Sequence, residues 1–331
     1  MLTVAVTGPT GTFGFGLLPM LEADERIGRI VGIARRPFDP AEHGWTKMEY
    51  RRGDVRAPRQ LARAFAGADV VVHLAFAITG ASDRRTIRAI NVEGTMNTFA
   101  AAAEAGARRF VYASSVAAYG FATDNPAVMT EEWPARPAEH LFYAREKAEI
   151  ELLLAETAAE HPAIDLYVLR PSVVLGPHSV GAKSFLPAAV EPLAKRLGSL
   201  ALRFPLPVPA LVAPLPVQFV HERDVGEALA LCVRGAGPPG TYNLAGDGVL
   251  TAIDVARELG FAPLSVPSGP VQAAARLLAG LPFAPPRVGW AEAISRPAIM
   301  DAGKARRELG WRPRYTGLEA LRDTLRAQRE R

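Results

Sequence analysis

The stretch Thr3–Gly14, TVAVTGPTGTFG, decides how the chain folds. Its first part, Thr3–Thr7, consists of β-branched and small apolar residues of the kind that form a short buried strand. The glycine-rich turn Gly8–Gly14 follows at once, and Leu17–Leu21 behind it is compatible with a helix. Glycines at such a junction permit a tight turn and let backbone N–H groups approach an anion. A plain β-turn has the same composition, but the position between strand and helix favours a site for the phosphates of a nucleotide.

The same alternation of strand and helix continues through the first half of the chain. Apolar runs without polar alternation indicate strands that are buried on both faces, as in a parallel sheet covered by helices. Longer Ala-, Leu- and Arg-rich stretches lie between them and have helical spacing, as at Thr95–Ala105 and Tyr143–Ala159. The predicted fold class is therefore α/β, a doubly wound parallel sheet of the Rossmann kind. The expected strands are Thr3–Thr7, Ile30–Ala34, Val70–Leu74, Phe110–Ser114 and Asp165–Arg170.

The composition and periodicity of the sequence change after the strand expected at Asp165–Arg170. Residues 172–216 and 260–300 are rich in Pro, Gly and Ala and have weak periodicity. Between them, Val217–Val220 and Thr241–Leu244 read as strands, and Asp224–Val233 reads as a helix. The chain is therefore expected to leave the sheet, return to it and leave it again.

This pattern predicts two units. Residues 1–171 are expected to form a dinucleotide-binding Rossmann domain, to which the chain returns at about 217–245. Residues 172–216 and 246–331 are expected to form a smaller, mixed α/β substrate lobe over the strand ends, where α/β proteins bind their ligands.

Composition excludes several classes of protein. Of the 331 residues, 49% are hydrophobic and 22% are charged, close to the averages for soluble globular proteins. The formal net charge is +4, but the arginines are scattered singly or in doublets, so no nucleic-acid partner is predicted. The most apolar stretch, Phe204–Val217, is short and interrupted by prolines, so no membrane partner is predicted.

A single cysteine, Cys232, rules out a disulfide framework and a cysteine-based zinc site, and its apolar neighbours indicate a buried small side chain. The first residues run straight into a strand without a basic and apolar leader, so we expect a cytoplasmic protein. His73 and His221 lie in strand-like runs, where structural roles are expected. No group of His, Asp and Glu has the spacing of metal ligands, so no metal is predicted.

The end of the second predicted strand bears on the choice of nucleotide. Sheets that bind NAD usually place an Asp or Glu there, which accepts hydrogen bonds from the ribose hydroxyls. Here the strand ends in Ala34, and Arg35 and Arg36 follow. Two guanidiniums suit a bidentate grip on a 2′-phosphate, although two solvated surface arginines would look the same. NADP(H) is therefore favoured over NAD(H). Farther on, Asp54 and Val55 are expected at the adenine, with a helix N-cap by Asp54 as the competing interpretation.

Two later segments carry the hydroxyl and ammonium groups of a candidate catalytic site. Ser115 follows the fourth predicted strand, and Tyr143 and Lys147 open a long amphipathic helix, where positions i and i+4 share a face. An ammonium beside a phenol lowers the pKa of the phenol, as a positive nicotinamide ring does, so Tyr143 can act as a general acid or base near neutral pH. A serine hydroxyl at a neighbouring strand end can bind the same substrate oxygen. A Tyr-x-x-x-Lys pair alone is often a surface feature, but its place after the glycine turn favours catalysis.

At this point the sequence resembles a known family, the extended short-chain dehydrogenases/reductases, also called the NAD-dependent epimerase/dehydratase family. The resemblance covers nearly the whole chain. Besides the glycine turn, it rests on Gly53–Val55, Val72–Ala75, Asn91–Thr95, Ser114 and Ser115 with Tyr119 and Gly120, Tyr143 with Lys147, Leu169–Pro171, Phe219–Val225, Tyr242–Leu244, Asp301–Ala305 and Leu309–Trp311.

The resemblance implies a role for each matching residue. Tyr143 is the proton donor or acceptor, Lys147 tunes it and holds the nicotinamide ribose, and Ser115 orients the substrate oxygen. Hydride moves between the nicotinamide and a carbinol or carbonyl carbon. The chain after Pro171 meets the nicotinamide amide through its backbone at about Val173. The cofactor-binding set is Gly8, Thr10, Gly11, Thr12, Phe13, Arg35, Arg36, Asp54, Val55, Leu74, Ala75, Phe76, Asn91, Tyr143, Lys147, Pro171 and Val173.

Departures from the family pattern narrow the reaction. Nucleotide-sugar dehydratases of this family carry an Asp-Glu pair directly after the catalytic hydroxyl residue, where this chain has Val116 and Ala117, so a dehydratase is not expected. Nucleotide-sugar enzymes also carry an arginine that contacts the diphosphate just before the strand that begins here near Phe219. That arginine is missing here. Family members commonly carry a further arginine before the motif that begins in this chain at Asp301, but Arg296 lies closer to Asp301 than the family spacing.

The stretch Phe204–Pro214 is unusually apolar, which suits a hydrophobic ligand better than a charged nucleotide sugar. A Pro-rich loop that packs on the core of its own lobe would have the same composition. We therefore predict an NAD(P)-dependent oxidoreductase that interconverts a ketone and a secondary alcohol on a small, fairly apolar molecule. The alternatives are an NAD-dependent sugar or nucleotide-sugar epimerase and, more remotely, a non-catalytic NADPH-sensing regulator. The resemblance also implies a homodimer paired through the helices at Thr95–Ala105 and Tyr143–Ala159.

Overall fold

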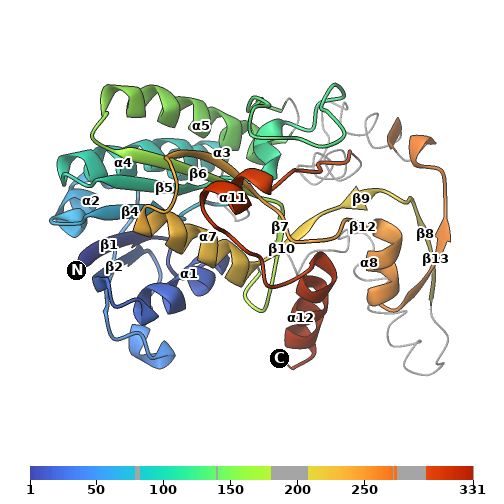
Figure 1. Cartoon of the computed structure of the whole chain (residues 1–331), viewed down its shortest axis with the longest axis horizontal. Helices are drawn as coiled ribbons and strands as arrows, with labels where there is room; N and C mark the ends of the chain where they lie inside the picture. The colour runs from blue at the N-terminus through green and yellow to red at the C-terminus, as the bar shows by residue number, and fades with distance from the viewer. Residues whose placement is uncertain (79–82, 139–140, 180–207, 271, 274–295, 331) are drawn as a thin grey trace.

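A seven-stranded parallel sheet forms the centre of the molecule (Figure 1). The strand order is β11-β6-β5-β4-β1-β2-β3, and every neighbouring pair is parallel. The predicted doubly wound α/β fold is thereby confirmed. The computed structural model describes residues 1–78, 83–138, 141–179, 208–270, 272–273 and 296–330. The sheet strands are β1 (Leu2–Thr7), β2 (Ile27–Ala34), β3 (Met48–Arg52), β4 (Val70–His73), β5 (Arg109–Ala113), β6 (Asp165–Pro171) and β11 (Gly240–Leu244).

The direction in which strands are added reverses at β1. This first strand lies between β2 and β4, so the chain builds one half of the sheet outward to β3 and the other half outward to β11. In such sheets the crevice outside the carboxyl ends of the strands at the reversal is where ligands bind. The loops after β1, β2 and β4 therefore lie at the position expected for the nucleotide.

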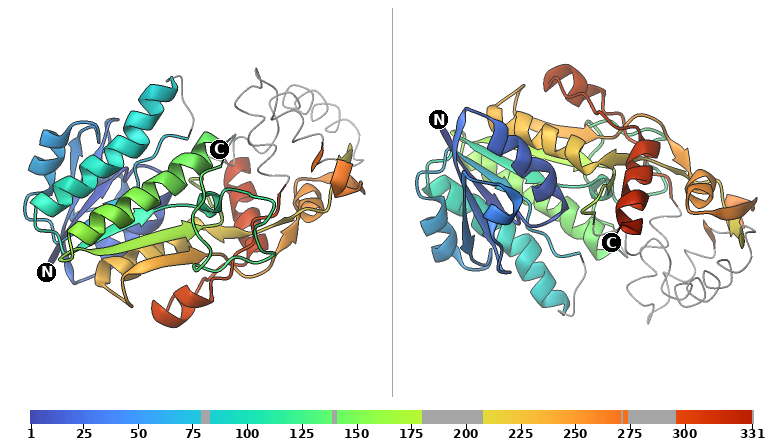
Figure 2. Two further views of the ribbon diagram at one scale, coloured as in Figure 1. Left: turned by 90° about the horizontal axis from the view of Figure 1, so that it is seen from above. Right: turned by 90° about the horizontal axis from the view of Figure 1, so that it is seen from below.

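Helices cover both faces of the sheet (Figures 1 and 2). Side chains of α1 and α7 pack on one face, and side chains of α2, α4 and α5 pack on the other. The strands supply both clusters because their side chains alternate: Val4 and Val6 join the first cluster, and Ala5 joins the second. The helices are α1 (Thr12–Ala23), α2 (Pro58–Phe65), α4 (Gly94–Glu104), α5 (Phe142–Glu160) and α7 (Glu222–Arg234).

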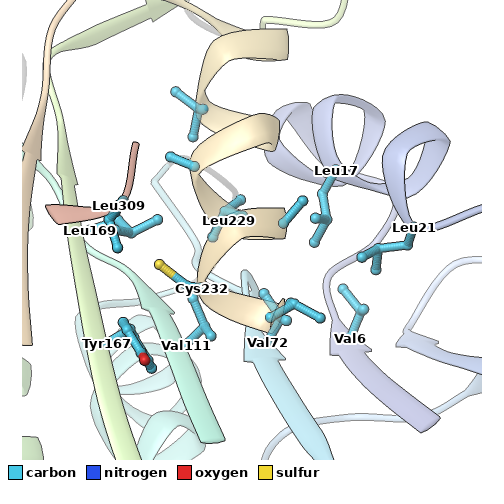
Figure 3. Close-up of a cluster of buried hydrophobic side chains, with 14 of the residues drawn as sticks. Val6, Leu17, Leu21, Val72, Val111, Tyr167, Leu169, Leu229, Cys232 and Leu309 are labelled. Atoms are coloured by element: carbon cyan, nitrogen blue, oxygen red, sulfur yellow. The ribbon is translucent and has the colours of Figure 1, made fainter. Parts of the chain in front are cut away.

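Cys232 lies in the core between α7 and the sheet, as the sequence predicted. Figure 3 shows its sulfur near Leu229 on the same helix and above the strands that carry Val72 and Val111. The thiol is completely buried, and burial raises its pKa well above the usual range. Cys232 is therefore a small apolar side chain of the core and not a reactive thiol.

The helices α1 and α7 approach each other through two glycines. A Cβ added at Gly16 would lie 2.1 Å from the carbonyl oxygen of Glu222, and one added at Gly226 would lie 2.1 Å from the carbonyl oxygen of Gly16. Any side chain at either position would force the two helices apart. This contact brings the start of α7 to the start of α1, beside the glycine turn.

The sequence analysis missed β3. Its residues MEYRR carry charged side chains, and the strand lies at the edge of the sheet, where it pairs with β2 alone. An edge strand does not need apolar residues on both faces, so its pattern lacks the signal that identified the buried strands.

Beyond the main sheet, short strand pairs lie toward the other end of the molecule (Figure 1). The strand β10 pairs with β7 in parallel, β9 pairs with β12 in antiparallel fashion, and β8 pairs with β13 in parallel. These elements are β7 (Val173–Leu175), β8 (Val208–Val212), β9 (Pro216–Val217), β10 (Phe219–His221), β12 (Leu250–Thr251), β13 (Phe261–Ser265), α8 (Ala252–Glu258), α11 (Gly303–Glu308) and α12 (Gly317–Arg329).

The predicted strand Val217–Val220 is in fact two short strands. Gln218 lies between β9, which pairs with β12, and β10, which pairs with β7. Its side chain accepts a hydrogen bond from Met300 N at 2.8 Å and donates one to Met300 O at 3.1 Å. Neither piece joins the main sheet, whereas the predicted strand at Thr241–Leu244 does so as β11.

The apolar stretch Phe204–Pro214 is described only from Val208 onward. Val208–Val212 forms β8, so this part is a strand and not a Pro-rich loop. The remaining described elements are the short helical turns Pro40–His43, Ala89–Glu93 and Val116–Tyr119 and the helix α3 (Arg84–Arg88). Every helix of the described residues falls short of the length and apolarity needed to cross a membrane.

Candidate active site

Ser115 and Tyr143 come together at the end of β5. Ser115 comes two residues after the end of this strand and caps the turn Val116–Tyr119, where its Oγ accepts a hydrogen bond from Ala117 N at 3.2 Å. Tyr143 lies in the first turn of α5, and its phenol is hydrogen-bonded to the Ser115 side chain. The structure therefore joins two residues that the sequence placed on separate elements.

Lys147 lies one helical turn after Tyr143 and is almost completely buried. Its Nζ donates to the carbonyl oxygen of Ala113 at 2.6 Å and to the hydroxyl of Tyr112 at 3.1 Å. It also lies 4.0 Å from the centre of the Phe76 ring, within the range of a cation–π interaction. Burial lowers the pKa of Lys147 to about 7, although Glu151 and Glu146 act in the opposite direction.

One electrostatic expectation was wrong for this structure. The sequence predicted that Lys147 lowers the pKa of Tyr143, but the pKa of Tyr143 is raised, because burial outweighs the hydrogen bond from Ser115. The ammonium is directed at the carbonyl of Ala113 and at Tyr112. Tyr143 is thus a phenol that holds its proton at neutral pH.

Behind these residues lies a buried ion pair that the sequence analysis did not find. Arg170 on β6 donates from Nε and Nη2 to the carboxylate of Glu151, and the two side chains are 5% and 6% exposed. Ser114 Oγ donates to the same carboxylate. The network ties β5, β6 and α5 together directly behind Ser115. Glu151 lies four residues after Lys147, and this helical spacing was the one available signal.

The glycine turn has the shape that a nucleotide phosphate requires. Gly8 has a φ of +67°, and a Cβ there would lie 2.8 Å from Ala75 N, so the chain itself demands glycine. Gly11 is different: it precedes α1 with an ordinary φ of −94°, and a Cβ there would meet only Gly8 O at 3.5 Å. The space that this missing side chain leaves lies in front of a helix N-terminus, and it fits the phosphates of the predicted cofactor.

Other residues of the turn have partners of their own. The hydroxyl of Thr12 donates to the carbonyl oxygen of His178 at 2.9 Å, and Phe13 packs at the edge of the core. His178 is held by Glu222, which accepts from its Nδ1 at 2.6 Å and from its backbone N–H at 3.0 Å. The sequence analysis missed His178. Only backbone groups of Thr12 remain for the pyrophosphate role. Thr10 is half-buried in the same turn.

At the end of β2, Arg35 and Arg36 extend into solvent. Neither guanidinium has a hydrogen bond or ion pair with any residue that the structure describes. Asp54, in the loop after β3, is paired with Arg56 through bonds of 3.0 and 2.6 Å. It does not cap α2, whose N-cap residue is Ala57. The Arg56 side chain, with burial opposing it, lowers the pKa of Asp54.

The loop after β4 is fixed by Asn91. Its Oδ1 accepts from Ala77 N at 2.7 Å, and its Nδ2 donates to Ala77 O at 3.0 Å and to Glu146 at 2.7 Å. Asn91 therefore shapes the loop that carries Leu74, Ala75 and Phe76. Burial raises the pKa of Glu146, a residue that the sequence analysis did not consider.

Three more of the predicted cofactor residues are placed as follows. Val55 is buried against Gly94, where a Cβ would lie 2.5 Å from its Cγ2. Pro171 ends β6, and Val173 begins β7 with its side chain 40% exposed. The N–H of Val173 donates to Gln218 O at 3.3 Å, so it pairs with its own chain.

The two histidines with expected structural roles are buried within networks. His73 Nδ1 lies 2.7 Å from the Thr7 hydroxyl, and its Nε2 lies 2.9 Å from the Thr95 hydroxyl. Burial lowers its pKa to about 3, so the ring is neutral. His221 accepts from Arg223 N through Nδ1 at the start of α7.

Comparison with known proteins decides the family. The sequence model of the NAD dependent epimerase/dehydratase family matches residues 4–245. The protein belongs to this family. The match includes the glycine turn, Ser115, Tyr143 and Lys147, and the chain is therefore an enzyme of the extended short-chain dehydrogenase/reductase type that takes a nicotinamide cofactor.

Two similar proteins match nearly the whole chain, and a third matches about half of it. The uncharacterized protein y4nG of Sinorhizobium fredii is 28% identical over 97% of this chain and 77% of its own length. The uncharacterized protein Rv0501 of Mycobacterium tuberculosis is 27% identical over 98% and 84%. Sterol demethylase protein B of Methylococcus capsulatus is 32% identical over 53% of this chain and 52% of its own length.

Solved structures of the same fold are similar to it over their full length. The crystal structure of gox2253 has a TM-score of 0.75 at 27% identity and covers 99% of this epimerase/dehydratase-family chain and 98% of its own. The NAD complex of dTDP-glucose 4,6-dehydratase from Bacillus anthracis has a TM-score of 0.71 at 18% identity, with coverage of 100% and 97%.

Proposed function

We propose that the protein is an NADP(H)-preferring oxidoreductase that interconverts a ketone and a secondary alcohol on a small, fairly apolar molecule. The observation that carries the proposal is the hydrogen bond between Ser115 and Tyr143 beside the buried Lys147. The two hydroxyls can bind one substrate oxygen between them, as ketone chemistry requires. A nicotinamide supplies or accepts the hydride when it is bound.

The side chains of this chain would divide the work as follows. Ser115 donates to the substrate oxygen and orients it. Tyr143, whose raised pKa keeps its proton in place, delivers that proton to the oxygen as negative charge develops there during reduction. Lys147, fixed by Ala113 and Tyr112, would bind the nicotinamide ribose, and the glycine turn would hold the phosphates.

An apolar substrate is supported by the surroundings of Tyr143. The Phe76 ring meets the Tyr143 ring edge to face at 5.4 Å, and the turn after Ser115 begins with Val116 and Ala117. In the family pattern, nucleotide-sugar dehydratases carry an Asp-Glu pair at these two positions, and this chain has neither residue there. The names of two partial relatives, sterol demethylase protein B and a 3beta-hydroxysteroid-dehydrogenase/decarboxylase of Arabidopsis thaliana, also refer to apolar alcohols or ketones.

The preference for NADP(H) is supported by the end of β2. Ala34 offers no carboxylate to a ribose, and the guanidiniums of Arg35 and Arg36 extend into solvent beside it. The nearby carboxylate of Asp54 is already paired with Arg56, so its charge is compensated. A 2′-phosphate would therefore meet net positive charge.

We also propose that α4 and α5 pair with their copies in a homodimer, and that the short strands around β8, β12 and β13 belong to a substrate lobe. The α5 helix exposes Leu152, which is 49% exposed. An exposed leucine on a long helix is the kind of side chain that a subunit contact covers.

The test begins with the cofactor. Freshly purified protein is denatured, any released nucleotide is identified, and the empty protein is titrated with NADPH and NADH. We expect NADPH to bind at least tenfold more tightly, a difference of about 1.4 kcal/mol, and we expect a panel of cyclic ketones to be reduced with equimolar consumption of NADPH.

The same experiment separates the alternatives. The runner-up, a sugar or nucleotide-sugar epimerase, is favoured by the family name and would use the same three residues. It would show tightly held NAD⁺ that does not exchange and isomerisation without net cofactor consumption. A protein that binds NADPH, turns over neither class of substrate and retains a partner protein only with NADPH would be a regulator.

A further inference from the structure

Phe121 has a backbone conformation that its residue type avoids. Its φ is +52°, and it is the only non-glycine residue with a positive φ among those that the structure describes. The left-handed region is costly for a bulky side chain and is normally left to Gly, Asn or Asp. Such a residue persists only where its surroundings hold it in place, and strain of this kind gathers at functional sites.

Two contacts hold this segment. The preceding Gly120 has a φ of +81°, and a Cβ there would lie 2.4 Å from the carbonyl oxygen of Arg136, so the chain passes Arg136 at close range. Arg296, which comes much later in the sequence, donates from Nη1 to the carbonyl oxygen of Phe121 at 2.5 Å. The arginine that the sequence analysis considered as a diphosphate ligand is therefore bound to the loop beside the catalytic residues.

Phe121 packs on the same small cluster as the catalytic tyrosine. Both side chains are partly buried and lie against Ala117, Leu141 and Ala144. Phe76 contacts the same tyrosine from the loop after β4. Phe121 is thus a partly buried phenylalanine in the left-handed region, packed on the same cluster as Tyr143.

We propose that Phe121 is a specificity-determining residue whose ring, with that of Phe76, contacts the hydrocarbon frame of the substrate next to the carbonyl, and that Arg296 is the positioning residue that fixes it. The inference rests on the proposed ketone–alcohol function and deepens it. The substrate class that fits is a ketone or secondary alcohol carried on an alicyclic or aromatic ring, without a charged group near the reacting carbon.

The rings of Phe76 and Phe121 form an aromatic wall that would recognise a hydrocarbon group. Flat rings give apolar contact area to a hydrocarbon and nothing to a phosphate, so two phenylalanines beside the phenol favour a ring substrate. Arg296 donates to the backbone carbonyl of Phe121, so its guanidinium is used to hold the segment that carries the Phe121 ring. An enzyme for a nucleotide sugar would need that charge on the diphosphate of the substrate.

The test compares two ketones in NADPH-dependent reduction, cyclohexanone and the fused-ring 1-decalone. Phe121→Asn suits the left-handed backbone but removes the ring, and Phe121→Leu keeps apolar bulk. We expect Phe121→Asn to raise the KM for 1-decalone at least tenfold, with a smaller rise for cyclohexanone and a smaller change in kcat. The preference for 1-decalone, measured as the ratio of the two kcat/KM values, falls at least fivefold, and Phe121→Leu lies between Asn and the wild type.

Arg296→Met is expected to lower the same ratio, and Arg296→Lys to restore part of it, because lysine can still donate to the Phe121 carbonyl. The matched control is Phe261→Asn on β13, a partly buried phenylalanine on a different element, which should leave the ratio within twofold. Unchanged ratios in Phe121→Asn, at any melting temperature, would overturn the inference, since a structural role alters stability and not substrate preference.

A binding experiment keeps the two proposals apart. The alcohols 1-decalol and cyclohexanol are titrated into the NADP⁺-loaded protein by calorimetry. If the wild type reduces neither ketone but binds 1-decalol more tightly and Phe121→Asn removes this preference, the proposed function is wrong and the inference about Phe121 holds. If the wild type binds both alcohols equally, the inference is wrong.

Discussion

At the scale of single residues, the proposed role of Tyr143 as the proton donor gives the most direct test. Tyr143→Phe removes that proton and leaves the ring that packs against Phe76. We expect kcat to fall by about 10²–10⁴-fold, the usual contribution of general acid catalysis. The Kd of NADPH should stay within about threefold, because the phenol is a minor part of the cofactor contact.

The measurement is steady-state reduction together with an equilibrium titration of NADPH. Tyr167→Phe is the control, since it removes a phenol that donates to Gly237 O, away from the site. Tyr167→Phe should keep kcat within twofold. Substantial turnover by Tyr143→Phe would show that another group supplies the proton.

The buried ammonium of Lys147 makes stability depend on pH. Burial lowers its pKa in the folded protein to about 7 from its ordinary value of 10.5. Between these values the unfolded chain binds the proton and the folded chain releases it, so this group's contribution to the free energy of unfolding rises with pH. Below pH 7 the folded protein carries the full cost of a buried charge.

Lys147→Met should therefore gain most over the wild type at low pH. We expect the difference in the free energy of unfolding, variant minus wild type, to be greatest near pH 6 and to shrink steadily toward pH 10. Urea unfolding at several pH values measures it. A difference that stays constant over this range would mean that Lys147 titrates alike in the folded and unfolded chains.

At the scale of elements, the Glu151–Arg170 pair joins α5 to β6. Glu151→Gln leaves the guanidinium of Arg170 buried without a carboxylate, and it also disturbs Ser114, which donates to the same group. We expect a loss of about 3–5 kcal/mol in the free energy of unfolding, typical of a broken buried pair.

The matched control is Glu258→Gln. Its carboxylate pairs with Arg322, whose side chain is 55% exposed, so the loss should stay below about 1 kcal/mol. Equal losses in the two variants, measured by urea unfolding, would show that burial does not strengthen the dependence on the Glu151–Arg170 pair.

The same elements show what the sequence could and could not predict. The strands β1, β4 and β5 and the glycine turn were predictable because their pattern is local and their burial on both faces leaves only apolar residues. The edge strand β3 carries charges and gave no such signal. The predicted strand near Val217 is divided because its two halves pair with different strands, β12 and β7, and a local pattern does not reveal which distant segments a strand pairs with.

The candidate site divides in the same way. Ser115 and Tyr143 were paired from motif spacing, and their hydrogen bond agrees with that pairing. The residues around them, Tyr112 under Lys147, Glu146 at Asn91 and Arg170 behind Ser114, act through contacts between distant segments, which no local pattern contains. The direction of the Tyr143 pKa was missed for the same reason, because it depends on burial and on where the ammonium of Lys147 is directed.

At the scale of the whole molecule, the main sheet and its helices form one body, and the first turn of α5 lies at its edge toward the short strands (Figure 2). Tyr143 is in that turn. The α5 helix therefore serves two regions. Its first turns carry Tyr143 and Lys147, and its later part exposes Leu152. A homodimer built through α4 and α5 would cover that leucine and support the helix that carries the catalytic pair.

Leu152→Arg tests this assembly because it places a charge where the proposed dimer buries an apolar side chain. An uncompensated charge in an apolar contact opposes association. We expect the wild type at about 50 µM to elute as a dimer in size-exclusion chromatography with light scattering, because a dimer with a micromolar Kd is formed at that concentration. Leu152→Arg is expected to elute as a monomer. Val128→Arg is the control: Val128 is 51% exposed, belongs to neither helix, and precedes Met129, which pairs with Met300, so its variant should remain dimeric. A monomeric wild type would contradict the pairing, and a dimeric Leu152→Arg would move the contact off α5.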